Sequence, residues 1–410
     1  MKHKLSVGNG IAVLFTTFVD YFGLGMSFIL LPGAILSNNG LLAQTTSPTT
    51  RIFFMSTLMM LYPLGQLFGA QFIARLSDRF GKKKMLLTSL TGTLIGTIIA
   101  ALAFVSKDFY LACAGRLVTG LFAANTAISD SYMAHMSTKQ TKTRNLAISQ
   151  AVFGFGWILG PRIAGLFTDQ YSFWGTSTPL WLLIGLLTIN IGIVALCLTE
   201  HINSHIAPTN MILRIKEILC TLTTNTTSSL FAVWALFIFG WSLYVQFMAG
   251  FLIKTHSYNT TQTGKAFALM GAIYMINQLI SVRLVAKWLK PRNAIIFITP
   301  LTGMFLFYIA YLTSPHYLLI PLVGFATAIA FSRTNILAAL SNSTPRHKQG
   351  ETMGLTWSLQ AFGLALAASP IGGMLFAWTP GGPLIAGGCL ILASALFLFV
   401  VVPRSKAVSQ

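Results

Sequence analysis

Apolar runs of about 20 residues recur along almost the whole chain, and each is long enough to cross the hydrocarbon core of a bilayer as a helix. Only 9% of the 410 residues are charged, which is too few to cover the surface of a soluble protein of this length. The sequence therefore predicts an all-α, polytopic membrane protein. Twelve spans are expected, at 10–36, 52–74, 85–105, 109–134, 145–168, 180–198, 229–254, 264–287, 293–313, 316–341, 352–378 and 381–402.

The positions of the basic residues explain the net charge of +19. Nineteen Lys and Arg residues fall at the two termini and in the loops on one side of the predicted spans, against four on the opposite side. This bias places both termini in the cytoplasm and predicts contact with anionic lipid heads on that side. Nucleic acid is therefore not an expected partner. We expect a monomer that contacts the lipid bilayer and a small-molecule substrate.

The four cysteines are scattered, with no spacing typical of a disulfide framework or a metal site. No metal and no cofactor are expected. A membrane enzyme or receptor would need a cluster of His, Ser and Asp residues or a sizeable soluble domain, and the sequence shows neither. We therefore expect a protein that is not an enzyme.

The chain contains two similar halves. Ala74–Lys84 resembles Val282–Arg292 at an offset of about 208, and Pro161 lies against Pro370 in nearly the same register. The longest polar loop separates the halves. The predicted organisation is an N-terminal six-helix bundle at 1–200, a cytoplasmic central loop at 201–228 and a C-terminal six-helix bundle at 229–410. Transporters build a midplane site between two such pseudo-symmetric bundles.

The loop between spans two and three reads Asp78-Arg79-Phe80-Gly81-Lys82-Lys83-Lys84. Glycine permits a tight turn, an acid can accept hydrogen bonds from helix-terminal amides, and the cations can contact the cytoplasmic leaflet. The pattern favours a conformational latch. The alternative is a basic loop with a turn glycine.

Span five contains Gly156-x-x-x-Gly160-Pro161-x-x-Ala164-Gly165. Glycine lets a neighbouring helix approach closely, and proline removes a backbone donor and loosens the turn before it. The pattern predicts a tightly packed helix that can bend. Arg162 lies about 26 Å up this span, and Asp169 follows seven residues later. We therefore expect Arg162 and Asp169 to act at an outer gate or to snorkel, rather than to anchor the substrate.

These motifs resemble the major facilitator superfamily, and within it the twelve-span drug:proton antiporters of the tetracycline-efflux type. The loop at Asp78 is similar to the family's D-R-x-G-R-R, and span five to its antiporter signature G-x-x-x-G-P-x-x-G-G. In span four, Arg116-Leu-Val-Thr-Gly-Leu-Phe-Ala-Ala resembles R-x-x-Q-G-x-G-A-A. Asp20-x-x-Gly-x-Gly-x6-Pro resembles the first span of tetracycline exporters. The resemblance covers essentially the whole chain.

The resemblance implies a twelve-helix, two-bundle fold in which spans one and four line a central cavity. It also implies proton-driven export across a bacterial inner membrane, and it adds Arg144 to the cytoplasmic latch. Two departures argue against assuming tetracycline as the substrate. His135 stands where the tetracycline exporters have an acid, nine residues before that arginine, and Arg162 adds a charge that the pattern does not require.

Proton coupling is predicted to use a carboxylate, because every histidine lies in a loop or at the edge of a span. Asp20 lies about 15 Å into span one, and the depth of Arg116 differs from it by about 5 Å. Burial favours the neutral acid and a guanidinium favours the carboxylate, so an acid balanced between them can carry a proton. A fixed Asp20–Arg116 ion pair is the alternative. Asp130 is expected as a network or capping acid, and Arg333 as a snorkelling or, alternatively, a cavity residue.

A substrate pocket in such a protein combines apolar and aromatic surface with a few polar groups. The alternative role for each candidate is packing within a bundle or against lipid. The candidates are Asn125, Gln150, Trp241, Tyr244, Gln246, Tyr274, Asn277, Gln278, Asn335, Trp357 and Gln360.

The leading hypothesis is a proton-coupled secondary active transporter that exports small amphiphilic compounds by alternating access. The rival is a proton-coupled importer or exporter of an organic anion, an amino acid or a siderophore. Three Arg residues on spans four, five and ten, against two Asp residues on spans one and four, favour an anionic ligand. The second half shows no further acid within its spans.

Overall fold

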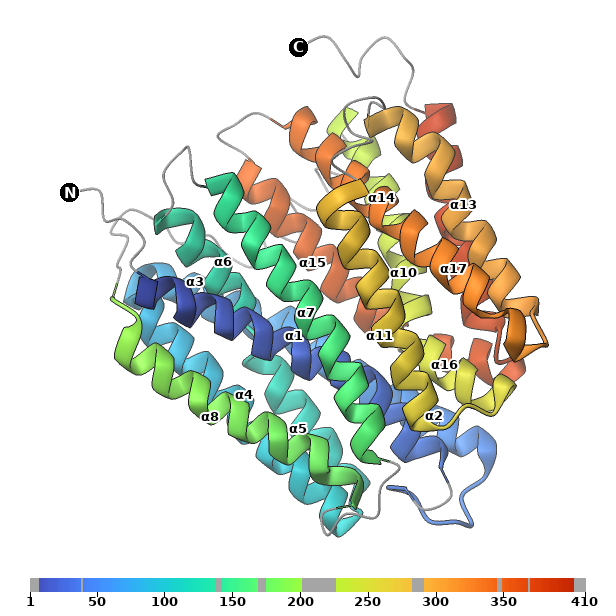
Figure 1. Ribbon diagram of the computed structural model, residues 1–410, viewed down its shortest axis with the longest axis horizontal. Coiled ribbons are helices and arrows are strands. Elements are labelled where there is room, and N and C mark those ends of the chain that lie inside the picture. Colours follow the sequence, from blue (N-terminus) through green and yellow to red (C-terminus); the bar gives the residue numbers. More distant parts are fainter. Residues whose placement is uncertain are drawn as a thin grey trace. The chain divides into compact units, whose positions relative to one another are not determined.

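The computed structural model describes residues 7–37, 40–136, 142–168, 175–200, 226–281, 291–344, 349–367 and 369–401. Within these ranges the chain forms helices and short connections, with no strand (Figure 1). The first half contains α1 (Val7–Leu36), α2 (Pro48–Gly65), α3 (Gln71–Phe80), α4 (Lys82–Ser106), α5 (Phe109–Leu121), α6 (Asn125–Met136), α7 (Lys142–Thr168) and α8 (Thr178–Cys197). The second contains α10 (Thr226–His256), α11 (Thr260–Ile276), α13 (Pro291–Tyr311), α14 (Leu319–Ser343), α15 (Gln349–Ala367), α16 (Pro370–Trp378) and α17 (Gly382–Val401). The π-helical turns η1 (Gln66–Ala70) and η3 (Asn277–Ser281) follow α2 and α11, and the 3-10 turns are η2 (Gly175–Ser177) and η4 (Pro315–Tyr317).

Helices lie at the positions of all the predicted spans. Nine helical segments of the described chain are long and apolar enough to cross a membrane, and the bent pair α15 and α16 makes a tenth if it is one span. The other two expected spans are α7, which carries three basic residues, and α11 with η3, which stops where residues 282–290 leave the described ranges. The chain is therefore a multi-pass, all-α membrane protein. The cytoplasmic placement of its termini stays a prediction.

Two of the predicted spans are interrupted. The span at 109–134 breaks between α5 and α6, and Ser89 of α4 bridges the break by donating to the Phe122 carbonyl and accepting from the Ala124 N–H (3.2 Å). Such a substitute partner is needed because lipid offers no hydrogen bond to an exposed backbone. The span at 352–378 bends by 49° between α15 and α16. Pro370 begins α16 and has no N–H to continue the α15 ladder.

Contacts divide the chain into two compact units. The first consists of Met1–Ile206 with Leu252–Ala272, and the second of Ala207–Phe251 with Ile273–Gln410. In the first, α1 packs along α7, and α4 packs against α5 and α8 (Figure 1). In the second, α13 packs against α14 and α17. The segment 252–272 groups with the first unit although it follows the predicted central loop. Most of that loop lies outside the described residues, and the predicted boundaries at 200 and 228 stay untested.

The glycines of α7 serve two different neighbours. At roughly 100° per residue, Gly156 and Gly165 lie on opposite faces of the helix. Gly156 and Gly160 face α1, where a Cβ added to Gly160 would lie 2.3 Å from the carbonyl oxygen of Phe22. Gly165 faces α11, where the Thr261 hydroxyl donates a hydrogen bond to the Gly165 carbonyl (2.6 Å). One short motif thus allows α7 to pack closely on both sides.

In the second unit, side chains of α10 hold α15 through its backbone. Trp234 Nε1 donates to the Thr356 carbonyl (3.2 Å), and Gln246 Nε2 donates to the Leu364 carbonyl (3.2 Å). Hydrogen bonds of this kind satisfy polar groups that would otherwise be buried without a partner. They fix the register of the two helices and so position the polar residues between them.

Candidate functional site

Asp20 lies in the middle of α1, and its carboxylate is held by the two residues that begin α6. Asn125 Nδ2 donates to Asp20 Oδ1 (3.0 Å), and the Thr126 hydroxyl donates to Asp20 Oδ2. The break after α5 makes this arrangement possible, because it places a helix start at the level of Asp20. A helix N-terminus also carries partial positive charge, which favours a carboxylate nearby.

Asn125 connects this carboxylate to α4. Its Nδ2 also donates to Thr93 Oγ1 (3.2 Å), while its Oδ1 is buried without a partner. Further along α6, Asp130 accepts a hydrogen bond from the Ser149 hydroxyl of α7 (3.2 Å). Asp130 thus joins α6 to α7, which is a contact that a network acid makes.

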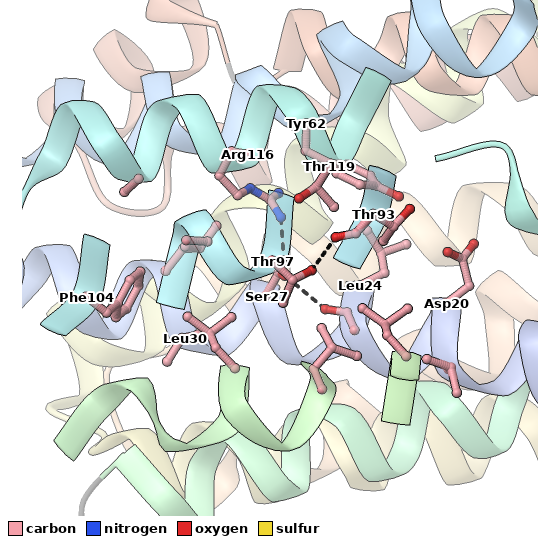
Figure 2. A pocket seen from close by; sticks show the side chains of 18 residues that line it. Asp20, Leu24, Ser27, Leu30, Tyr62, Thr93, Thr97, Phe104, Arg116 and Thr119 are labelled. Atoms are coloured by element: carbon pink, nitrogen blue, oxygen red, sulfur yellow. Dashed lines mark hydrogen bonds between the residues drawn. The ribbon is translucent and has the colours of Figure 1, made fainter. Parts of the chain in front are cut away.

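Arg116 lies on α5, and no acid in the described part of the chain forms an ion pair with it. Its Nη1 donates to Ser27 Oγ on α1 (3.3 Å), and its guanidinium carbon lies 4.8 Å from the centre of the Tyr62 ring on α2. Figure 2 shows Asp20 apart from the guanidinium, which points toward Ser27. The fixed Asp20–Arg116 ion pair is therefore not formed in this structure.

A pocket of about 50 Å³ inside the first unit is lined by both charged residues (Figure 2). Its walls come from α1, α2, α4, α5 and α8, and they are largely apolar, with Leu24, Leu183 and Leu187 among them. One water needs about 10–15 Å³ of such space, and a drug-sized ligand needs about 300 Å³ or more. The pocket can therefore admit a few waters or a small ion, and it excludes a larger cargo.

The turn at Gly81 is closed by a residue that the sequence motifs did not indicate. Glu200, just after α8, accepts hydrogen bonds from the backbone N–H groups of Lys83 (3.1 Å) and Lys84 (3.2 Å) at the start of α4. Gly81 has a φ of 101°, and a Cβ there would lie 2.4 Å from the Glu200 carboxylate. The positive φ and the carboxylate each require glycine at this position.

The remaining residues of the predicted latch differ in burial. Lys82 is fully buried and donates to the Ser131 hydroxyl of α6. Arg79 is exposed, and its guanidinium carbon lies 5.3 Å from the centre of the neighbouring Phe80 ring. The side chains of Asp78, His135 and Arg144 lie outside what the structure describes.

The two predicted gate residues can be placed only in part. Arg162 lies on α7 and has a buried Nη1 without a hydrogen-bond partner among the described residues. Asp169, the acid that follows it in the sequence, lies outside the described residues. Their pairing stays a prediction.

Arg333 is a half-buried cation of the second unit. It lies on α14 and donates from Nη2 to Gln360 Oε1 on α15 (2.9 Å). Its guanidinium carbon lies 5.3 Å from the centre of the Trp241 ring on α10. Three helices of the second unit thus meet at Arg333, which is held within the unit by polar and aromatic contacts.

Other cavity candidates of the second unit contact neighbours within the unit, and Asn277 Nδ2 also donates to Thr327 Oγ1 on α14 (3.3 Å). The Tyr244 ring lies 4.3 Å from that of Phe325, and Asn335 Nδ2 donates to a carbonyl of its own helix (2.8 Å). Asn277 Nδ2 donates to the Ile273 carbonyl (2.9 Å). Their role in a substrate cavity stays a prediction. Two candidates, Gln150 in the first unit and Trp357 in the second, have exposed side chains.

Three residues of the Asp20 and Arg116 site were not singled out from the sequence. Ser27 lies seven residues after Asp20, which places both on one face of α1, so helical periodicity could have found it. Thr126 and Tyr62 carry no such signal. A hydroxyl and an aromatic ring are common on membrane spans, and only contact with Asp20 or Arg116 distinguishes these two.

A family model for the Major Facilitator Superfamily matches residues 13–368. The chain belongs to this superfamily. Its relatives include the tetracycline resistance protein of class G from Vibrio anguillarum, 26% identical over 370 residues that cover 89% of each chain. The class B protein from Escherichia coli is 23% identical over 400 residues, which cover 95% of this chain and 93% of the relative.

Solved structures of other members share the fold. A D-xylose–proton symporter superposes with a TM-score of 0.76 at 16% identity, covering 98% of this chain and 99% of that chain. The human organic anion transporter MFSD10 (TETRAN) gives 0.72 at 17% identity, covering 95% and 99%. At these identities the likeness establishes the fold alone. The superfamily places the chain among membrane transporters of small molecules rather than among enzymes.

Proposed function

We propose that this transporter is a proton-coupled efflux antiporter of small amphiphilic compounds in a bacterial inner membrane, working by alternating access. The proton gradient is its energy source, and no cofactor takes part. The observation that carries the proposal is Asp20, an acid in the middle of a membrane span whose carboxylate is held by neutral donors and not by a cation. A charge in the membrane core is costly and is usually retained for function.

The two partners of Asp20 respond differently to protonation. An amide NH₂ can only donate, whereas a hydroxyl can donate or accept. Asn125 therefore fits the oxygen that stays unprotonated, Oδ1. Thr126 can rotate its hydroxyl from donor to acceptor, so the proton is placed on Oδ2. Asp20 can thus gain and lose a proton with both partners still in contact.

Two further features support export. The span-five signature brings α7 into close contact with both α1 and α11, so movement of either neighbour is transmitted to α7. Both relatives named above are tetracycline resistance proteins. We accordingly propose a cargo class, small amphiphilic compounds, and no particular drug.

A second candidate function is the proton-coupled transport of an organic anion. It is favoured by Arg116 and Arg333, two guanidinium groups whose described hydrogen bonds go only to neutral groups. A cation held in this way keeps attraction for an anionic cargo. Cargo panels containing both amphiphilic drugs and carboxylates distinguish the two functions.

The test is gradient-driven accumulation of these cargoes in inverted membrane vesicles. Asp20→Asn should reduce accumulation to the level of vesicles without the transporter, because the amide cannot carry a proton. Exchange of cargo across the membrane without a gradient should persist. Asp108→Asn is the matched control: Asp108 is an exposed cap at the start of α5, and asparagine caps equally well. Unchanged accumulation by Asp20→Asn would rule out the proton-carrier role.

A further inference from the structure

The Arg116 end of the first unit's pocket is rich in donors that lack acceptors. Among the described residues only Nη1 of Arg116 has a hydrogen-bond acceptor, and Nε is buried without one. The Tyr62 hydroxyl lines the same pocket and makes no hydrogen bond with the described part of the chain. These two side chains come from different helices, α5 and α2, and they converge because the guanidinium lies over the Tyr62 ring.

The polar neighbours do not neutralise the charge of Arg116. Ser27 accepts from Nη1, but the Ser27 hydroxyl is neutral and itself donates to the Gly23 carbonyl (2.9 Å). The face of an aromatic ring offsets only part of the charge of a buried cation. Asp20 lies in the same pocket with its oxygens held by α6. The guanidinium therefore lacks a negatively charged partner.

We propose that this pocket is a binding site for one small monovalent anion, a halide ion or the carboxylate group of a small molecule, held by Arg116 and Tyr62. The volume of about 50 Å³ suits an ion or head group that replaces one or two waters, and it excludes large anions. The free groups are donors, which matches a ligand that can only accept. This site goes beyond the proposed function, since its occupancy does not depend on the direction of transport; under the second candidate function its ligand is the carboxylate of the cargo itself.

Anion binding at this site should depend on the charge of Asp20. An anion at Arg116 repels an ionised carboxylate in the same apolar pocket. Removal of the Asp20 charge should therefore tighten anion binding. A purely structural arginine would show no such dependence, so this coupling separates binding from a general effect on folding.

The experiment measures binding of radiolabelled chloride to the full-length transporter in lipid nanodiscs, with a bulky organic sulfonate, which carries no carboxylate and is too large for the pocket, keeping the ionic strength constant. Wild type should bind chloride saturably, and acetate should displace it. Arg116→Gln should weaken binding by at least about tenfold, since hydrogen bonds to a charged group are lost. Tyr62→Phe keeps the ring and removes only the hydroxyl, and it should weaken chloride binding by a smaller factor. This second variant keeps the test valid if the arginine variant does not fold. Asp20→Asn should bind chloride more tightly than wild type.

Lys265 supplies the control for the chloride-binding experiment. Lys265→Gln removes one exposed positive charge on α11 and should leave chloride binding unchanged. In vesicles, competition between chloride and a carboxylate cargo would identify the cargo head group as the natural ligand. Transport of a neutral cargo that requires chloride would identify the halide. The proposal is overturned if neither probe binds saturably, or if Arg116→Gln and Tyr62→Phe both bind chloride as wild type does.

Discussion

The centres of the two units use the same kind of cation in different surroundings. In the first unit, Arg116 shares a pocket with Asp20 and makes one long hydrogen bond, 3.3 Å to Ser27. In the second, Arg333 makes a 2.9 Å bond to Gln360 and lies over Trp241. The sequence of the second unit holds only two acids, and both lie outside its predicted spans. Within the predicted spans, protonation of a carboxyl group is therefore confined to the first unit.

The comparison separates two tasks that a coupled transporter must perform. A proton carrier needs an acid whose partners tolerate both protonation states, as Asn125 and Thr126 do for Asp20. A cargo-binding residue needs a fixed charge held by its neighbours, and Arg333 is held by Gln360 and Trp241. We therefore expect the first unit to determine the energy coupling and the second to affect cargo affinity.

The two halves also differ in the loops whose sequences resemble each other. In the first, Gly81 and Glu200 close a turn against the start of α4. The matching segment, Val282–Arg292, contains neither a glycine nor an acid. The matching segment thus lacks the glycine that the turn of the first half requires.

Among the variants that test this difference between the two units, Arg333→Gln is expected to have the largest effect on transport. The KM for cargo should rise by about tenfold, because a hydrogen bond to a charged group contributes about 1.5–3 kcal/mol. The pH dependence of transport should stay that of wild type. Transport in vesicles over a range of cargo concentrations and pH checks both. If Arg333→Gln lost its response to the proton gradient as Asp20→Asn is expected to, the division of tasks between the units would fail.

An intermediate effect is expected from Asn125→Leu. The loss of its amide removes a hydrogen-bond donor to the Asp20 carboxylate, so the protonated form of the acid is favoured. Half-maximal transport should then occur at a lower proton concentration. The pH profile should move upward by about one unit. Asn335→Leu in the second unit is the matched control, because that amide bonds only its own helix, and its profile should not move. Identical profiles for both variants would show that Asn125 does not act on Asp20.

The smallest effect is expected from Glu200→Gln at the end of α8. The amide keeps the size of the side chain and loses the negative charge beside the start of α4, which is worth about 0.3–1 kcal/mol. The thermal midpoint in detergent should fall slightly at low salt, and the difference from wild type should shrink at high salt. A difference that persists at high salt would mean that hydrogen-bond geometry, and not charge, closes the turn.

Much of the architecture could be predicted from the sequence, because apolar length alone decides whether a segment spans. The break between α5 and α6 could not be, since it depends on Ser89 of another helix satisfying the freed backbone groups. Asp20 and Arg116 stood out as charges within apolar runs. Whether they pair was left open by the sequence, because that depends on where α6 starts relative to α1.

The basic loop illustrates the same division. Its turn glycine was evident from the local sequence, since positive φ is a property of one residue and its neighbours. Glu200 was not, because it follows Gly81 by more than a hundred residues and no spacing rule connects them. The closed turn emerged only when α8 was placed beside α4.

The sequence by itself determined that this is a helical, multi-pass membrane protein, where its spans lie and which few charges enter them. These properties depend on hydrophobicity and helical period along a single segment. The tertiary structure decided that Asp20 is held by Asn125, 105 residues away, and that Arg116 meets no acid in the described part of the chain. The physical reason is that a polar side chain in a membrane core takes whatever donor or acceptor the neighbouring helices present. That choice is made by packing and not by local sequence.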